Sequence, residues 1–259
     1  MASWHPEQYL QFREERTRPC HDLVARIALA RPARIIDLGC GPGNSTAVLR
    51  ARWPEADVTG LDNSGTMLEQ ARASDENVQW VLGDIASWAD AEGQSYDVVF
   101  SNAALQWVGD HAALLPKLAA RVAAGGVLAV QVPSNWGAPA HTTMRSLAGS
   151  EKWRGRFPEN GVREWFVHEP GFYYDVLAPL AVKLDLWQTT YFQVMPEVRS
   201  IAEWYRGTGM RPFLDALQDD PSKQEFFEDY SRELERHFAP RKDGRVLFPF
   251  ERLFAVAAL

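Results

Sequence analysis

The fold of this 259-residue chain is decided by the stretch Arg34-Ile35-Ile36-Asp37-Leu38-Gly39-Cys40-Gly41-Pro42-Gly43-Asn44. Residues 34–38 are short, apolar and rich in β-branched side chains, which is typical of a fully buried strand in a parallel sheet. The three glycines that follow predict a tight turn with positive φ, where a ligand can lie against bare backbone. We expect Asn44 or Ser45 to cap the next helix, with the first amide groups of that helix directed at the ligand.

The spacing of the glycines distinguishes this turn from a nicotinamide-binding fingerprint. That fingerprint reads G-x-G-x-x-G and places a pyrophosphate on a helix N-terminus, whereas Gly39, Gly41 and Gly43 read G-x-G-x-G and follow Asp37. The arrangement suits a ligand with both an ammonium and a carboxylate. It resembles the first motif of the class I S-adenosylmethionine (SAM) methyltransferases. The alternatives are a turn that binds nothing and the glycine turn of a flavin or nicotinamide enzyme.

Composition and charge restrict the kind of partner. A hydrophobic fraction of 46% and a charged fraction of 24% indicate an ordinary globular protein. The net charge of -7 argues against nucleic acid or an anionic membrane as the main partner, because both need a basic face. We see no membrane-spanning run and no signal-peptide pattern, so we expect a cytoplasmic protein. Cys20 and Cys40 are expected to be free thiols, and no histidine and cysteine group has metal-ligand spacing.

A second buried strand, at residues 57–61, ends at Asp62. An acidic residue about 20 positions after the glycines is where a ribose diol is held in dinucleotide-binding folds. A carboxylate accepts two hydroxyl bonds well, so we expect Asp62 to bind the ribose with Asn63 beside it. The alternative is that Asp62 caps the helix at 63–72, which Ser64 can do equally well.

The third and fourth strands end in further candidate ligand groups. The turn Gly83-Asp84-Ile85, after the strand at 78–82, resembles the adenine site of these methyltransferases. The resemblance implies that the Asp84 carboxylate accepts from the exocyclic amine and that the Ile85 amide donates to a ring nitrogen; the alternative is an Asx-type turn. The strand at 96–102 ends at Asn102, at the edge where doubly wound sheets bind ligands.

Five βα-type units fill about the first half of the chain and predict an α/β fold. We expect a Rossmann-like, doubly wound sheet of seven strands, mostly parallel with an antiparallel last strand at 245–257. Residues 1–30 are predicted to form an N-terminal helical cap. Residues 31–132 and 184–259 are predicted to form the SAM-binding core with C-terminal helices, which break at 207–212. Residues 133–183 are predicted to be a helical lid over the substrate, inserted before the sixth strand.

Over its whole length the chain resembles the trans-aconitate methyltransferase family. The stretches that carry this resemblance outside the cofactor motifs are 4–19, 102–107, 130–136 with Pro139 and His141, 173–175, 189–191 and 208–212. The resemblance implies methyl transfer from SAM to a carboxylate of trans-aconitate, a small tricarboxylate, giving a monomethyl ester and S-adenosylhomocysteine. The alternatives are a SAM methyltransferase that acts on a fatty acid, phenol or quinone, and a SAM-binding protein without activity.

A carboxylate nucleophile needs little catalytic machinery. It is ionised at neutral pH and requires no general base. The sulfonium is a good electrophile without a metal, so the protein has to supply alignment and a dry pocket. We therefore assign no proton-transfer residue and no metal. His111, which follows Asp110, is expected to lie at the surface or to cap a helix.

The candidate cofactor residues belong to the glycine turn, the acidic turns, the end of the fourth strand and a segment ahead of the turn. They are Tyr9, Arg16, Asp37, Gly39, Gly41, Gly43, Asn44, Asp62, Asn63, Asp84, Ile85 and Asn102. For the substrate we expect Arg206 and Arg211 to grip carboxylates through two parallel bonds, unless they are solvated helix-end residues. Further candidates for the substrate pocket are Trp107, His141, Tyr173 and Tyr174.

Overall fold

The structure is a computed structural model that describes residues 13–157, 162 and 165–259, with the backbone alone for residues 13–16. The chain divides into two compact units, which are described separately. The sheet unit comprises Arg16–Ser134, Trp165–Thr189 and Arg252–Leu259. Of the described residues, the helical unit comprises 13–15, 135–157, 162 and 190–251.

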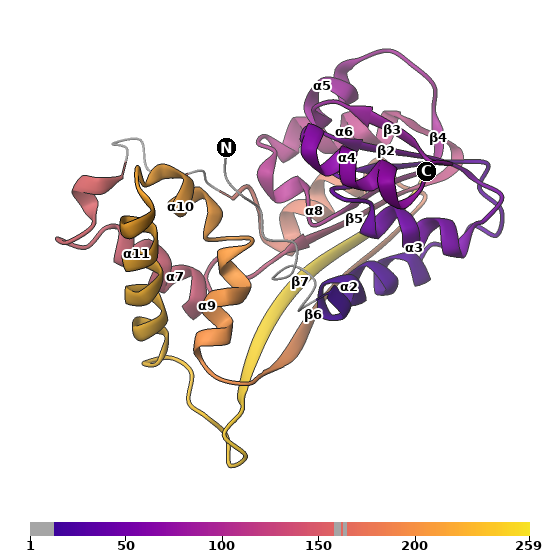
Figure 1. Cartoon of the computed structure of the whole chain (residues 1–259). Helices are drawn as coiled ribbons and strands as arrows, with labels where there is room; N and C mark the ends of the chain where they lie inside the picture. The colour runs from indigo at the N-terminus through magenta and orange to yellow at the C-terminus, as the bar shows by residue number, and fades with distance from the viewer. Residues whose placement is uncertain (1–12, 158–161, 163–164) are drawn as a thin grey trace. The chain divides into compact units, whose positions relative to one another are not determined.

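A seven-stranded sheet in the order β3-β2-β1-β4-β5-β7-β6 confirms the predicted fold class (Figure 1). The strands are β1 Arg34–Leu38, β2 Asp57–Asp62, β3 Gln79–Leu82, β4 Tyr96–Asn102, β5 Val122–Pro133, β6 Lys183–Met195 and β7 Val246–Ala258. Neighbouring strands from β3 to β5 pair in parallel, and β7 pairs antiparallel with β5. The apolar run of β1 explains its central place, because Ile35, Ile36 and Leu38 are fully buried.

Helices of the sheet unit precede, connect or follow its parallel strands. They are α2 Arg13–Ala25, α3 Asn44–Arg52, α4 Gly65–Ser74, α5 Ile85–Asp90, the 3-10 turn η1 Leu105–Trp107, α6 His111–Ala120 and α8 Pro170–Leu177. Leucines of α6 pack with the apolar side chains of one sheet face, among them Ile36, Val99 and Leu128, in one hydrophobic cluster. Cys20 and Cys40 are buried free thiols, as expected.

The helical unit has a core of aromatic side chains. Its elements are α7 Pro139–Ala148, the 3-10 turn η2 Arg154–Arg156, α9 Arg199–Arg206, α10 Arg211–Ala216 and α11 Asp220–Leu234. Figure 1 shows α7, α9 and α11 side by side. Trp153 meets Phe226 edge-on at 5.0 Å between ring centroids, and the Tyr230 hydroxyl donates to the carbonyl oxygen of Ala140 over 3.1 Å. The burial of these large side chains stabilises the unit.

The predicted domain map stays a prediction, and the two described units group some of its elements differently. The helices of 199–234 belong to one unit with α7, whereas the sequence assigned them to the core and α7 to a separate insertion. The physical reason is that buried aromatic faces of α9 and α11 share one hydrophobic cluster with α7 and Trp153. The predicted cap at 1–30 is described only from Arg13, where α2 begins.

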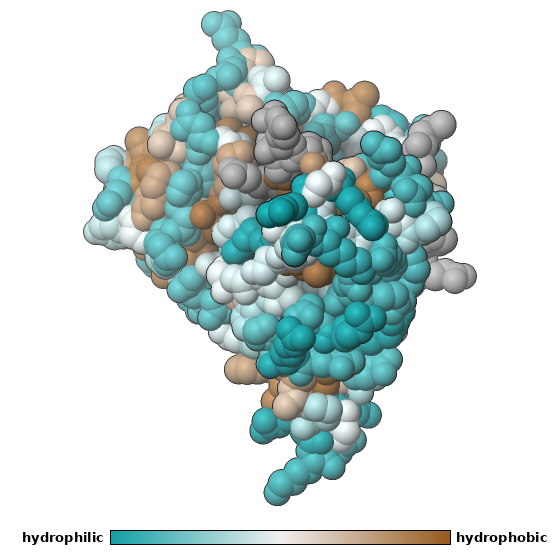
Figure 2. Space-filling view, turned by 90° about the vertical axis from the view of Figure 1, so that its left-hand side faces the viewer, coloured by the Kyte–Doolittle hydropathy of each residue, from teal (hydrophilic) through white to brown (hydrophobic). Residues whose placement is uncertain are grey.

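Figure 2 shows a face on which hydrophilic side chains predominate and hydrophobic ones form small, separate patches. Within the described ranges, no helix has both the length and the apolar character needed to cross a membrane.

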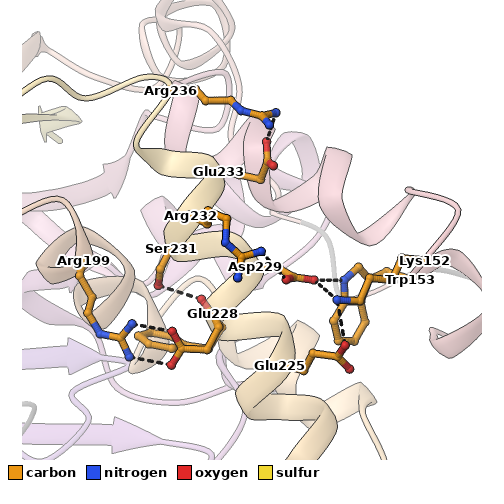
Figure 3. Close-up of polar contacts among 11 residues, drawn as sticks. Lys152, Trp153, Arg199, Glu225, Glu228, Asp229, Ser231, Arg232, Glu233 and Arg236 are labelled. Atoms are coloured by element: carbon orange, nitrogen blue, oxygen red, sulfur yellow. Dashed lines mark hydrogen bonds and ion pairs between the residues drawn. The ribbon is translucent and has the colours of Figure 1, made fainter.

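Carboxylates of α11 bind neighbouring segments of the helical unit (Figure 3). Asp229 accepts from Lys152 Nζ at 2.5 Å and from Trp153 Nε1 at 2.9 Å. Burial raises the pKa of Asp229, but these hydrogen bonds outweigh that effect and hold it below its ordinary value. Arg199 donates two parallel bonds to Glu228, at 2.6 and 2.8 Å. Asp229 is the stronger anchor, because its side chain is only 14% exposed.

We expect Asp229→Asn to lower the free energy of unfolding by about 1–3 kcal/mol, because it removes the buried acceptor charge that Lys152 and Trp153 share. Equilibrium denaturation measures this loss. Glu233→Gln is the matched control on the same helix, since its partner Arg236 is 73% exposed and such surface pairs contribute roughly 0–1 kcal/mol. A loss no larger than that of the control would contradict the anchor role.

Candidate functional site

The glycine turn after β1 has the backbone conformation that the sequence predicts. Gly39, Gly41 and Gly43 have φ of 74°, 55° and 90°, in the left-handed region that favours glycine. A Cβ on Gly39 would lie 2.2 Å from the Cβ of Ala104, so a side chain has no room there. A Cβ on Gly41 would meet nothing within 4 Å. Bare backbone therefore borders open space at Gly41, as a ligand cradle requires.

The amide groups of the turn bond mainly to the protein itself. Gly39 N and Cys40 N both donate to the carbonyl oxygen of Leu61, at 2.7 and 3.1 Å. Gly41 N donates to Asp62 Oδ2 at 2.9 Å. These bonds hold the turn rigidly against the end of β2, so what the turn offers a ligand is shape and space.

The predicted helix cap by Asn44 or Ser45 is wrong. The N-cap of α3 is Gly43, without a side-chain capping bond, and Asn44 is the first helical residue. The hydroxyl of Ser45 donates instead to Asp37 Oδ2 at 2.6 Å. A hydroxyl bond to a buried carboxylate is strong because the acceptor is charged. The helix does not need Ser45 as its cap, because glycine is acceptable at the N-cap position.

Asp37 is the most unusual group of the site. Its side chain is fully buried, and Ser45 and Thr46 each donate a hydroxyl bond of 2.6 Å to Oδ2. Its Oδ1 has no hydrogen-bond partner among the residues that the structure describes. Burial raises the pKa of Asp37 from 3.8 to about 6; the two hydroxyls lower it in part, and Asp62 raises it further. An unsatisfied buried acceptor of this kind fits a ligand ammonium.

Asp62 is held firmly at the end of β2. Its Oδ2 accepts from Gly41 N, and its Oδ1 accepts from Ser64 N at 2.8 Å. Ser64, not Asp62, caps α4, with Oγ accepting from Met67 N at 3.4 Å. Each carboxylate oxygen keeps a second lone pair, so Asp62 can still accept from two ribose hydroxyls. The neighbouring Asn63 is exposed.

Asp84 caps the helix that follows β3, rather than forming the Asx-type turn that was the alternative to its adenine role. It is the N-cap of α5, and its Oδ1 accepts from Ser87 N at 3.0 Å. Ile85 is the first residue of that helix and is buried. The cap engages one carboxylate oxygen, so the adenine role of Asp84 and Ile85 stays a prediction.

The end of β4 contributes a second buried acceptor. Asn102 is half-buried, and its Oδ1 has no hydrogen-bond partner within the described part of the chain. Ala103 takes a positive φ of 55° and donates its amide to the carbonyl oxygen of Gln131 at 2.9 Å. The Ser101 hydroxyl donates to the carbonyl oxygen of Leu38 at 2.9 Å. These bonds fix the carboxyl ends of β1, β4 and β5 against one another.

The aromatic substrate candidates of the sheet unit have different surroundings. Trp107, at the end of η1, is half-buried and meets Trp165 edge-on at 5.5 Å. Tyr173 is fully buried, and burial raises its pKa to about 12. Tyr174 is 56% exposed. The two tyrosines therefore differ in exposure, and their substrate roles stay a prediction.

The expectation of a surface or capping position for His111 is wrong. Asp110 is the cap of α6, with Oδ1 accepting from Ala113 N at 3.2 Å. His111 is fully buried, with Nδ1 3.1 Å from the Tyr173 hydroxyl and Nε2 2.9 Å from the Leu105 carbonyl oxygen. Burial lowers the pKa of His111, so the ring is a neutral link between α6, α8 and η1.

The substrate candidates of the helical unit are a buried histidine and two arginines. The ring of His141 lies 4.8 Å from that of Tyr205, and burial, with a contribution from Arg145, lowers its pKa to about 3. The Arg206 guanidinium lies over Phe227 at 4.9 Å and donates to Gln224 Oε1 at 3.3 Å. Arg211 begins α10 and is half-buried. These placements leave the clamp role of the two arginines a prediction.

Two candidate cofactor residues cannot be placed. Tyr9 lies outside the described residues, and Arg16 is described only by its backbone, within α2.

The structure also reveals a buried polar pair that the sequence analysis missed. Gln131 of β5 is fully buried, and its Oε1 accepts from Arg252 NH1 of β7 at 3.2 Å. Arg252 is only 7% exposed. The signal was present in the sequence, because Gln131 interrupts the apolar run 127–132. The partner of Gln131 could not be read from the sequence, because β5 and β7 pair although they are far apart along the chain.

Comparisons with known proteins identify the family. Residues 35–126 match the methyltransferase domain family. The chain is 47% identical to trans-aconitate 2-methyltransferase of Azoarcus sp. (strain BH72), over 99% of each chain. It is 46% identical to the enzyme of that name from Methylobacterium radiotolerans, over 99% of this chain and 98% of the other.

Solved structures share the fold at low sequence identity. The YcgJ protein of Bacillus subtilis superposes with a TM-score of 0.59 at 13% identity, covering 93% of this chain and 98% of the other. Phosphoethanolamine N-methyltransferase 2 of Haemonchus contortus, solved with S-adenosyl-L-methionine, gives a TM-score of 0.56 at 14% identity, covering 93% and 52%. These two likenesses concern the fold alone.

The buried Asp37 predicts an unusual dependence of stability on pH. Its pKa is about 6 in the folded chain against an ordinary 3.8, so the folded state binds the proton more readily. The free energy of unfolding therefore rises through this group as the pH falls from above 6 towards 4. We expect Asp37→Asn to be more stable than wild type at pH 8 by about 1–3 kcal/mol, and the difference to narrow by pH 5.

Denaturation curves at both pH values measure this difference. Asp90→Asn is the control, because it makes the same exchange at an exposed side chain of the sheet unit. A difference between wild type and Asp37→Asn that is equal at pH 5 and pH 8 would show that Asp37 does not titrate as a buried acid.

Proposed function

The chain belongs to the trans-aconitate 2-methyltransferase family of SAM-dependent methyltransferases, and on that premise we propose that it esterifies a carboxylate of trans-aconitate. The products are the monomethyl ester and S-adenosylhomocysteine. The observation that carries the proposal is the identity of 47% over 99% of both chains, which extends well beyond the methyltransferase domain at 35–126. cis-Aconitate, isocitrate and citrate are expected to be poorer substrates, since they present similar carboxylates in other geometries.

The residues after β1, β2 and β4 fit SAM. Asp37 Oδ1 and Asn102 Oδ1 are buried acceptors without partners in the described chain, and such atoms favour a positively charged ligand with N–H donors. The open space beside Gly41 lets a ligand approach the backbone. Asp62 would accept from the ribose hydroxyls, and Asp84 with Ile85 would border the adenine. When bound, SAM supplies its sulfonium methyl group as the electrophile.

The protein's part in the reaction is to bind, orient and exclude water. The acid substrate is ionised at neutral pH, so no side chain has to remove a proton. His111 and His141 are both buried and have lowered pKa values, which makes them neutral structural groups at pH 7. We propose that no general base and no metal takes part, and that alignment and desolvation of the carboxylate provide the rate enhancement.

The first test of this function is a panel of acids incubated with the protein and SAM, with the products identified by mass spectrometry. We expect the monomethyl ester of trans-aconitate to form fastest, with cis-aconitate, isocitrate and citrate slower. Fatty acids, phenols and quinones are the comparison substrates, and omission of SAM is the blank. If SAM is consumed with one of these compounds and with no tricarboxylate, the substrate assignment is wrong.

The second test concerns the ribose contact. We expect Asp62→Ala to weaken SAM binding by about 1–3 kcal/mol, because two hydroxyl groups lose their acceptor. Calorimetry measures the affinity, and a thermal melt shows whether the turn with Gly41 and Ser64 survives. Asp57→Ala is the matched control, since Asp57 is the exposed first residue of the same strand. Equal SAM affinity in Asp62→Ala and in this control would remove Asp62 from the site.

A further inference from the structure

Four polar side chains form a row across the sheet unit at the carboxyl edge of its parallel strands. They are Asp37 on β1, Asn102 on β4, Gln131 on β5 and Arg252 on β7. Asn102 pairs with Gln131, and Asp37 pairs with Phe100, two residues before Asn102. Gln131 pairs with Phe254, two residues after Arg252. Because side chains alternate between faces with a period of two, all four lie on the same face of the sheet.

This row contains an unusual concentration of unsatisfied buried atoms. Asp37 Oδ1, Asn102 Oδ1 and Gln131 Nε2 are each buried and lack a hydrogen-bond partner among the described residues. One such atom can be an accident of packing, but each costs folding free energy, and proteins rarely leave several together. Three in one row on adjacent strands indicate that a polar ligand completes them.

The row is polarised along its length. The orphan atoms of Asp37 and Asn102 are acceptors, whereas the orphan atom of Gln131 is a donor. Arginine can only donate, so the bond of 3.2 Å from Arg252 NH1 must end on Gln131 Oε1, which leaves the Nε2 amide turned away from the guanidinium. The β1 and β4 end therefore suits a cation, and the β5 and β7 end, with an amide donor beside a buried guanidinium, suits an anion.

We propose that Gln131 and Arg252 form the subsite that holds a carboxylate of the acid substrate. The inference rests on the proposed function. The glycine turn and Asp62 follow β1 and β2, so the cofactor occupies that side of Asn102. β5 and β7 lie on the other side of Asn102, displaced by about 5 Å for each strand. A second ligand next to the cofactor therefore meets Gln131, and Arg252 behind it supplies the charge that a carboxylate requires.

The test is Gln131→Glu, which keeps the shape of the side chain and reverses its chemistry. The new carboxylate pairs with Arg252, cancels its charge and removes the Nε2 donor. We expect KM for trans-aconitate to rise about 10- to 100-fold, while SAM affinity stays within about twofold. The melting temperature should hold or increase, because a neutral contact becomes an ion pair. A purely structural role of the pair would leave KM unchanged.

Gln94→Glu is the control for the chemical exchange, made at an exposed glutamine that also accepts from an arginine. Gln94 Oε1 also accepts from an arginine, Arg34 NH1, at 3.4 Å, but Arg34 begins β1 and so lies at the opposite end of the parallel strands. The same chemical exchange there should change neither KM nor SAM affinity. If Gln131→Glu does not fold, Arg252→Lys replaces it, since it keeps the charge but loses the planar fork; the subsite then predicts a smaller rise in KM.

Binding measurements separate this inference from the proposed function. Trans-aconitate is titrated into wild type and Gln131→Glu that are saturated with S-adenosylhomocysteine, and ester formation is measured independently. Binding that is lost in Gln131→Glu supports the subsite, even if wild type forms no ester. Equal binding of trans-aconitate by both proteins, or by neither, overturns it. A loss of SAM affinity with unchanged binding of trans-aconitate also overturns it, because the carboxylate recognised would then be that of the cofactor.

Discussion

The Asp37 carboxylate, fully buried at the end of β1, is the constraint on which the rest of the sheet unit depends. Its charge is tolerated only because Ser45 and Thr46 of α3 direct two hydroxyl bonds of 2.6 Å at Oδ2. These bonds tie the start of α3 to the end of β1, and the turn between them needs positive φ at every glycine. The pKa raised to about 6 shows that the compensation is incomplete. The remaining acceptor oxygen is the atom to which we propose that a cationic ligand binds.

The carboxyl edge of the sheet extends this constraint from one strand to four. Backbone and hydroxyl bonds at Ser101 and Ala103 fix the ends of β1, β4 and β5 relative to one another, so the polar groups behind them cannot reorient independently. Acceptors gather on β1 and β4, and donors gather on β5 and β7. This order matches a reaction that brings a sulfonium donor and an ionised acid together, since opposite charges need opposite surroundings.

The helical unit is stabilised differently, by aromatic packing with ion pairs at its border. Trp153 combines both, because its ring packs on Phe226 and its Nε1 donates to Asp229. His141 is buried among aromatic rings in the same unit and is neutral. Residues 199–234 join this unit because their large apolar side chains are buried together with those of α7, irrespective of separation in sequence. A domain prediction based on insertions between strands does not detect such packing.

The sequence by itself determined the sheet, the glycine turn and the positions of acidic residues near the ends of β1, β2 and β3, because these follow from local rules: apolar β-branched strands and positive φ at glycine. It could not determine that Ser45 would serve Asp37 rather than cap α3, or that His111 would be buried against Tyr173. Nor could it bring Gln131 and Arg252, 121 residues apart, into contact. Those facts depend on which distant strands and helices become neighbours, and only the tertiary structure, where burial changes the free energy of every polar group, decided them.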